Sequence, residues 1–177
     1  MTWTTIPAAG GKFYSSTASA AFTEVRAYGA WKLADEIVNG SASLQNDDEL
    51  FVAVPANTRF AIRGLINFTS NTTANFRLDW TGPTGYTHIT NTKVYSRIAA
   101  APTQLVDTRT FIEGALVGAS GAASLVNSTH GQLMELSGWL QTSSTAGTAQ
   151  IRWSQNTSNG SNTTVYAGSF IMLEKVV

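Results

Sequence analysis

Cysteine is absent from the chain of 177 residues. Its absence excludes disulfide bonds, thiolate zinc sites, cysteine-bound iron–sulfur clusters and cysteine nucleophiles. The fold must therefore be held together without covalent cross-links. Hydrophobic residues make up 43% of the sequence, close to the average of globular proteins, and a chain of this length can bury a substantial core.

Charged residues are also scarce, at 12% of the sequence, which is about half the usual share. Lysine plus arginine and aspartate plus glutamate number 11 each, so the net charge is zero. We expect no nucleic-acid partner, because no basic stripe is present to bind a phosphate backbone. The surface must be covered by Thr, Ser, Asn, Gln and Gly, which is typical of short strands and turns and of proteins that contact other subunits.

Long apolar runs are missing, and no stretch approaches the roughly 20 residues that a membrane-spanning helix needs. The N-terminal sequence MTWTTIP (1–7) lacks the basic start and apolar run of a secretory signal. We therefore expect a soluble protein that is made in a cytoplasm and has no membrane partner.

Catalytic and metal-binding patterns are not found. His88 and His130 have no second histidine at ligand spacing, so a surface or hydrogen-bonded role is expected for each. The nucleophile-elbow pattern G-x-S-x-G does not occur. We predict a protein that is not an enzyme and has no catalytic residue, metal or cofactor. A hydrolase whose serine, histidine and carboxylate meet only in space stays open as an alternative.

One acidic cluster, Asn46-Asp47-Asp48-Glu49, has two interpretations. Hard oxygen ligands of this kind suit calcium, but the spaced aspartates and distal glutamate of a calcium loop are missing. We favour a turn before a strand that begins at Leu50, with aspartate side chains accepting nearby backbone N–H groups. Asp35-Glu36 is a further acidic pair, but the sequence shows no matching acid for a glycosidase.

Apolar and polar residues alternate at period two in several segments, and this pattern predicts strands. The clearest alternations lie at 51–55, 60–68, 76–80 and 149–153, and we expect a closing strand at 169–177. Turns are expected at 82–85 and 156–162, which are rich in Gly, Pro, Asn and Ser. Trp80 and Trp153 lie on apolar strand faces, which predicts that both belong to the core.

The chain contains a weak internal repeat. Gly64-Leu65-Ile66 is followed by a polar turn and Ala74-Asn75-Phe76-Arg77, while Gly138-Trp139-Leu140 is followed by a similar turn and Ala149-Gln150-Ile151-Arg152. We interpret both as long hairpins in equivalent places of a double-sheet fold. The alternative is that any two amphipathic hairpins look alike.

Residues 1–23 differ from the rest, because they contain small residues and spaced apolar anchors without periodicity. The anchors, which are candidate interface residues, are Trp3, Ile6, Phe13, Tyr14 and Phe22. We expect an extended N-terminal arm that docks on a neighbour, with a disordered tail as the alternative. The predicted fold is all-β: an antiparallel, jelly-roll-like β-sandwich formed by one domain at 24–177.

Two separated blocks of the sequence carry a resemblance to a known family. Residues 31–50 read WKLADEIVNGSASLQNDDEL and are followed by VAVPAN at 52–57. The second block comprises AGT at 146–148, WSQNTS at 153–158, TTV at 163–165 and GS at 168–169. The chain resembles small virion proteins and C-terminal tail-protein modules of tailed phages of actinobacteria, whose motif reads approximately K-x-x-D-E-x-V-N-x-S-x-x-L-x-x-D-D-x-L.

The resemblance covers about residues 31–177 and implies a β-sandwich module on the virion, assembled in the host cytoplasm. No collagen-like stalk or coiled-coil heptad precedes it, which favours a capsid decoration protein over a full tail fibre. The implied partners are the major capsid protein and further copies of the chain, with a trimer favoured. The alternative is a tail-tip or fibre module that binds host cell-surface glycan. The resemblance implies no catalytic residues.

Overall fold

The computed structural model describes residues 28–97, 104–112 and 131–176, and these ranges form antiparallel β-sheets without a helix. The larger sheet contains eight strands: β1 (Gly29–Trp31), β2 (Glu36–Val38), β4 (Arg59–Thr69), β6 (Thr87–Arg97), β7 (Gln104–Ile112), β8 (Gln132–Gln141), β10 (Thr163–Val165) and β11 (Phe170–Lys175). The smaller sheet contains β3 (Gln45–Val54), β9 (Gly147–Gln155) and β5 (Phe76–Thr81). The predicted arm at 1–23 lies outside the described ranges, as does His130.

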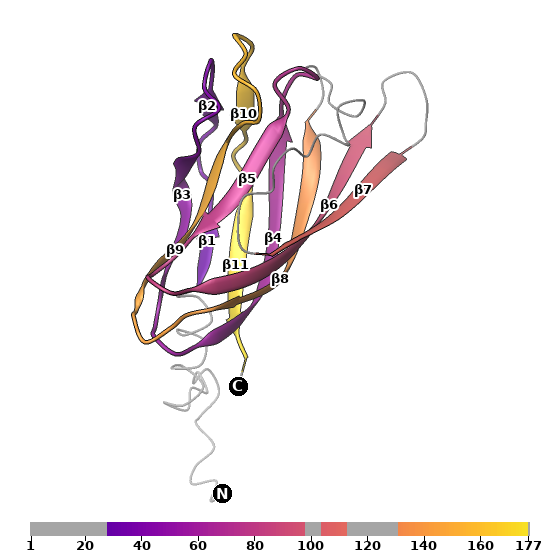
Figure 1. Cartoon of the computed structure of the whole chain (residues 1–177). Coiled ribbons are helices and arrows are strands. Elements are labelled where there is room, and N and C mark those ends of the chain that lie inside the picture. The colour runs from indigo at the N-terminus through magenta and orange to yellow at the C-terminus, as the bar shows by residue number, and fades with distance from the viewer. Residues whose placement is uncertain (1–27, 98–103, 113–130, 177) are drawn as a thin grey trace, which may run out of the picture.

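The two sheets lie face to face, with β3, β9 and β5 across the strands of the larger sheet (Figure 1). The strand orders are β1-β11-β4-β8-β6-β7 and β3-β9-β5. Strands that follow one another in the chain, such as β4 and β5 or β8 and β9, therefore lie in opposite sheets. This interleaving is typical of a jelly roll, and it confirms the predicted antiparallel, jelly-roll-like β-sandwich.

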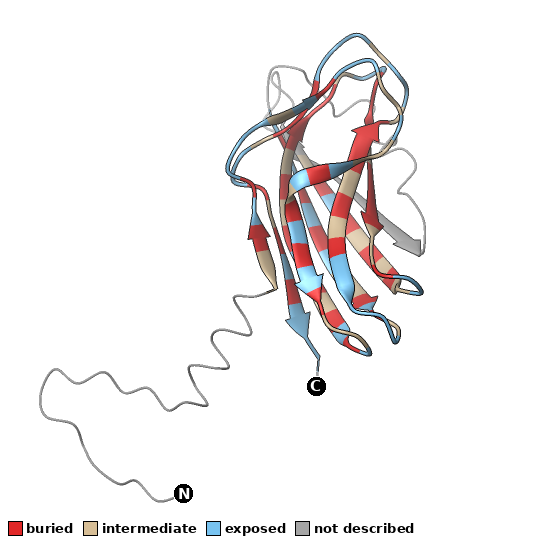
Figure 2. Cartoon of the chain, turned by 90° about the vertical axis from the view of Figure 1, so that its left-hand side faces the viewer, coloured by how far each residue is buried: buried red, intermediate tan, exposed pale blue. Residues whose placement is uncertain are grey.

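The core fills the space between the sheets, and burial alternates along the strands as period-two patterning requires (Figure 2). Trp80 and Trp153 are fully buried, which confirms their predicted place in the core. The largest other buried side chains are Phe60, Phe68, Phe76, Leu50, Ile62, Ile66, Leu78, Met134, Leu136 and Leu140. In the described part of the chain, no helix could serve as a membrane span.

The interpretation of the internal repeat as two hairpins is wrong in one respect. β4 pairs with β8 and β5 pairs with β9, so each repeat unit crosses from one sheet to the other instead of folding back within one. The two units nevertheless occupy equivalent places, because each contributes one strand to each sheet and lies beside its counterpart. Between β4 and β5 the residues 70–75 form the connection, and a turn of this length can serve a sheet crossing as well as a hairpin.

The glycine that opens each repeat unit lies where a neighbouring strand approaches closely. Gly138 has a φ of 144°, and a Cβ atom there would lie 2.0 Å from the carbonyl oxygen of Ile89 on β6. A Cβ atom on Gly64 would lie 3.0 Å from the carbonyl oxygen of Phe170 on β11. Glycine at these positions permits the close strand packing of the larger sheet.

Candidate interaction surface and the charged network beneath it

A buried ion pair fixes the chain where it leaves β1. The side chain of Lys32 is buried, and its Nζ lies 2.6 Å from Oε2 of Glu36 and 3.0 Å from each carboxylate oxygen of Asp47. The Nζ also lies 3.9 Å from Oε2 of Glu49. The ammonium group is thus surrounded by carboxylates, which compensates the cost of removing it from water.

Asp47 occupies the centre of this network and is completely buried. Its Oδ1 accepts hydrogen bonds from the backbone N–H groups of Glu49 (3.0 Å) and Leu50 (2.8 Å). Its Oδ2 accepts a hydrogen bond from Nε1 of Trp153, also at 3.0 Å. The carboxylate therefore joins β3 to β9 and to the loop after β1, with its lone pairs satisfied by backbone, ring and ammonium donors.

The acidic cluster is a bulge inside a strand, and not the turn before a strand that we expected. β3 begins at Gln45, and its register with β9 shifts between Asn46 and Phe51. Four residues of β3 lie in this interval, opposite one residue of β9. The prediction that an aspartate side chain accepts nearby backbone N–H groups is confirmed by the bonds to Asp47. A calcium ion bound by Asp47 would need the position that the Lys32 ammonium group occupies. Among the described residues, no group of side chains that could hold a metal ion is found.

Two further carboxylates fix the loop that follows Lys32: Glu49 binds the loop from β3, and Asp35 of the loop binds the segment between β10 and β11. Oε2 of Glu49 accepts hydrogen bonds from the backbone N–H groups of Leu33 (3.0 Å) and Ala34 (3.2 Å). Oδ1 of Asp35 accepts one from the backbone N–H of Ala167 (2.9 Å). Asp35 and Glu36 are thus both engaged in structural contacts, and the loop backbone is held at several successive residues.

Burial and ion pairing shift the pKa of Lys32 in opposite directions. Burial alone would lower the pKa of its ammonium group, but the hydrogen bonds and negative charges of Glu36 and Asp47 outweigh it and raise the pKa above the ordinary 10.5. Burial also raises the pKa of the Glu36 carboxyl above its ordinary 4.5, because the hydrogen bond from Lys32 offsets it only in part. The network therefore favours the charged form of Lys32 and disfavours the charged form of Glu36.

We expect the protein to lose stability in alkali. Because the folded pKa of Lys32 lies above 10.5, its stabilising contribution is present below that pH and is lost as the pH rises through the folded pKa. Urea unfolding should therefore give a free energy of unfolding that falls above about pH 10.5. The hydrogen bond to Glu135 also raises the pKa of Tyr95, which acts in the same direction, so the fall must persist in Tyr95→Phe. A flat profile up to about pH 11.5 would contradict this assignment.

The two sequence blocks that carry the phage resemblance lie in contact in the structure. β2 of the first block pairs with β10 of the second, from Glu36 opposite Val165 to Val38 opposite Thr163. The backbone of Lys32 donates to the carbonyl of Ser169 and accepts from the N–H of Gly168, each at 2.8 Å. The Asp47–Trp153 hydrogen bond adds a third link between the blocks.

Large apolar side chains gather on the outer face of the larger sheet, above this network. We call them the edge patch: Trp31, Leu33, Ile37, Phe170 and Met172. Leu33 is 82% exposed, Trp31 57% and Ile37 56%. The Trp31 ring stacks on Phe170, with centroids 4.6 Å apart, and Met172 lies opposite Gly29 in the same pair of strands.

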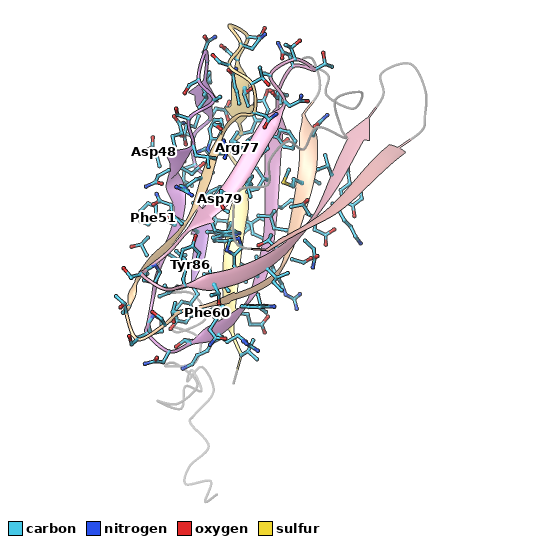
Figure 3. All side chains as sticks on the ribbon, viewed as in Figure 1. Asp48, Phe51, Phe60, Arg77, Asp79 and Tyr86 are labelled. Atoms are coloured by element: carbon cyan, nitrogen blue, oxygen red, sulfur yellow. The ribbon has the colours of Figure 1, made fainter. Side chains whose placement is uncertain are left out.

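The outer face of the smaller sheet is more polar. Arg152 of β9 forms an ion pair with Asp79 of β5, and Arg77 lies two residues away on the same face (Figure 3). Phe51 of β3 is 47% exposed and lies near the sheet edge, as does Asp48 (Figure 3). Among the described residues, the edge patch contains four of the exposed large apolar side chains, and Phe51, Leu133 and Val176 are exposed outside it.

His88 is buried in β6, which excludes the surface position among the two roles expected for it. Its ring stacks on that of Tyr86, with centroids 5.8 Å apart and planes inclined by 6°. Thr90 and Thr92 follow it on the same inward face of β6 and are also buried. The inward face of β6 therefore carries three buried polar side chains before the buried Val94.

The structure tests little of the predicted interface, because all five anchors of the arm lie outside the described residues. Sequence reasoning did not find the edge patch. A signal was present in the motif, where Trp31 and Leu33 flank Lys32 and Ile37 follows Glu36. In a strand-like segment, apolar side chains next to a buried charge must point to the opposite face.

No protein-family model matches this chain, and a comparison with curated proteins also finds no match. A comparison with solved structures finds the tripod (BppUct-A-L) from the baseplate of bacteriophage Tuc2009, with 10% sequence identity and a TM-score of 0.34. The alignment covers 99% of this chain and 76% of that chain. A likeness this remote assigns neither fold nor function.

Proposed function

We propose that the chain is a structural protein of a tailed-phage virion, and that it decorates the outside of the capsid by binding the major capsid protein. One observation carries the proposal. The two blocks of sequence that resemble phage virion modules are far apart in the chain, yet they meet through Lys32, Asp47 and Trp153, and Asp47 and Trp153 are separated by 106 residues. The resemblance therefore falls on residues that build this sandwich together, as a shared architecture requires.

The chemistry of the described surface suits adhesion. Charge is sparse in the whole chain. Within the motif, the carboxylates of Asp35, Glu36, Asp47 and Glu49 are engaged by Lys32, Trp153 and backbone donors. Apolar side chains on the edge patch are exposed instead. A protein that is not an enzyme and acts through its surfaces fits this distribution.

We further propose that the chain acts as a homo-oligomer, with a trimer favoured because capsid lattices present local three-fold positions. A specific contact would bury about 800 Å² per partner. Several such contacts per oligomer would convert modest individual affinity into stable occupancy of the particle.

Mass spectrometry of particles separated into heads and tails tests the location. We expect the chain in the head fraction, at a copy number comparable with that of the capsomers. Recovery in tails alone would replace decoration by the tail-tip or fibre alternative, for which exposed aromatic rings such as Trp31 could stack on sugars. Absence from both fractions would contradict a virion role altogether.

A further inference from the structure

The edge patch is exposed although the backbone beneath it is tightly held. The backbone N–H of Leu33 is bound by Glu49, and both backbone groups of Lys32 are bound by the strand end at Gly168 and Ser169. Leu33 therefore cannot relax inward to hide its side chain, which is 82% exposed. A rigid apolar surface of this kind is preorganised for binding, because its backbone loses little conformational entropy when a partner binds.

We infer that the edge patch binds the N-terminal arm, residues 3–22, of a second copy of this chain. The inference rests on the homo-oligomer of the proposed function and names its contact. Residues 1–22 contain one charged side chain, Lys12, and carry the spaced anchors from Trp3 to Phe22. The five side chains of the edge patch are likewise uncharged, and Lys32 turns inward. The exposed ion pair of Arg63 and Glu174 borders the patch at Met172. The apolar part of the patch, from Trp31 to Ile37, can therefore be desolvated together with the arm at low cost.

The length of the arm suits an exchange between copies. Fourteen residues lie between Phe13 and Tyr28, where the described chain begins, and the stretch from Phe13 to Tyr28 can span up to about 50 Å when extended. A domain of this size has a radius of gyration of about 15 Å. Phe13 can thus reach well beyond its own sandwich.

The direction of β1 favours a neighbouring copy over the same copy. The chain runs from Gly29 through Trp31 to Leu33, so the preceding residues join β1 at the end that points away from Leu33 and Ile37. An arm that covered its own edge patch would have to reverse its direction. In a symmetric ring, each copy can give one arm and receive one, which closes the assembly.

Engineered cysteines in the full-length chain test the contact cleanly, because the natural sequence has none. One receiver variant carries Leu33→Cys, and three donor variants carry Trp3→Cys, Phe13→Cys or Phe22→Cys. Receiver and donor proteins, distinguished by mass tags, are mixed, allowed to exchange and treated with a short bis-maleimide. We expect receiver–donor cross-links for at least one donor, and none with a control receiver that carries Thr148→Cys on the exposed face of the smaller sheet.

Each other outcome contradicts the inference. Cross-links only within one chain, in a protein that carries Leu33→Cys together with a donor cysteine, would show that the arm covers its own patch. Receiver–receiver cross-links alone would show that two patches pair with each other, and no cross-link at all would show that the arm binds elsewhere. An oligomer without receiver–donor cross-links overturns only this inference, whereas a monomer at all concentrations also overturns the proposed homo-oligomer.

A substitution gives an independent readout. Leu33→Asp should leave the thermal unfolding of the sandwich unchanged, because the side chain is largely exposed. In sedimentation it should raise the concentration at which the oligomer dissociates by roughly tenfold or more, as loss of a central apolar contact does. An unchanged dissociation concentration would contradict a contact at Leu33.

Discussion

Replacing Lys32 by methionine is expected to lower the free energy of unfolding by about 3–5 kcal/mol. Methionine fills a similar volume, but it leaves the carboxylates of Asp47 and Glu36 without their ammonium partner. Asp47 is completely buried and cannot recover its hydration without local unfolding. Urea unfolding at neutral pH, followed by circular dichroism, measures the loss.

Two further variants show whether the buried charge causes this loss. Lys93→Met removes an exposed lysine of β6 and should change the free energy of unfolding by about 0.5 kcal/mol or less. Lys32→Met combined with Asp47→Asn should be more stable than Lys32→Met alone, because the amide keeps an acceptor for the backbone of Leu50 while removing the unpaired charge. If Lys32→Met and Lys93→Met were equally mild, the network would not stabilise the fold.

The alternation of side chains allowed the strands and much of the core to be predicted from the sequence. Period two in 60–68 and 76–80 corresponds to β4 and β5, and the inward face of each carries the large buried rings. Alternation specifies which face of a strand is buried, but it contains no information on which strand lies beside it. That is why the pattern predicts a hairpin from β4 and β5, although these strands belong to different sheets.

The charged network was beyond sequence reasoning for a related reason. Asp47 is separated from Lys32 by 15 residues and from Trp153 by 106, and only the completed sandwich brings the three together. Polar residues in a row are ordinarily exposed, so the run at 46–49 predicted a turn. A bulge that turns one aspartate inward, while Asp48 stays exposed, depends on the donors that Lys32, just after β1, and Trp153 of β9 supply.

Replacing Trp153 by alanine should cost about 3–5 kcal/mol of stability, because it removes a fully buried ring from the centre of the sandwich. The ring also packs on Phe76, with centroids 5.9 Å apart, and donates its Nε1–H to Asp47. Circular dichroism should again follow the unfolding, because the substitution changes the tryptophan fluorescence itself.

Two other substitutions distinguish the contribution of the Trp153 ring from that of its hydrogen bond and from that of an exposed ring. Trp153→Phe retains most of the packing and removes the N–H donor, so it should cost about 1–3 kcal/mol, the penalty for a buried carboxylate oxygen that loses a partner. Trp31→Ala removes a ring of the same size from the edge patch, where it is 57% exposed, and should cost only about 1 kcal/mol through its lost stacking on Phe170. Trp31→Ala should instead weaken the oligomer, which Trp153→Phe leaves intact. Suppose that Trp31→Ala and Trp153→Ala lowered stability alike and that neither weakened the oligomer. The assignment of Trp153 to the stabilising core and of Trp31 to an interface on the edge patch would then be wrong.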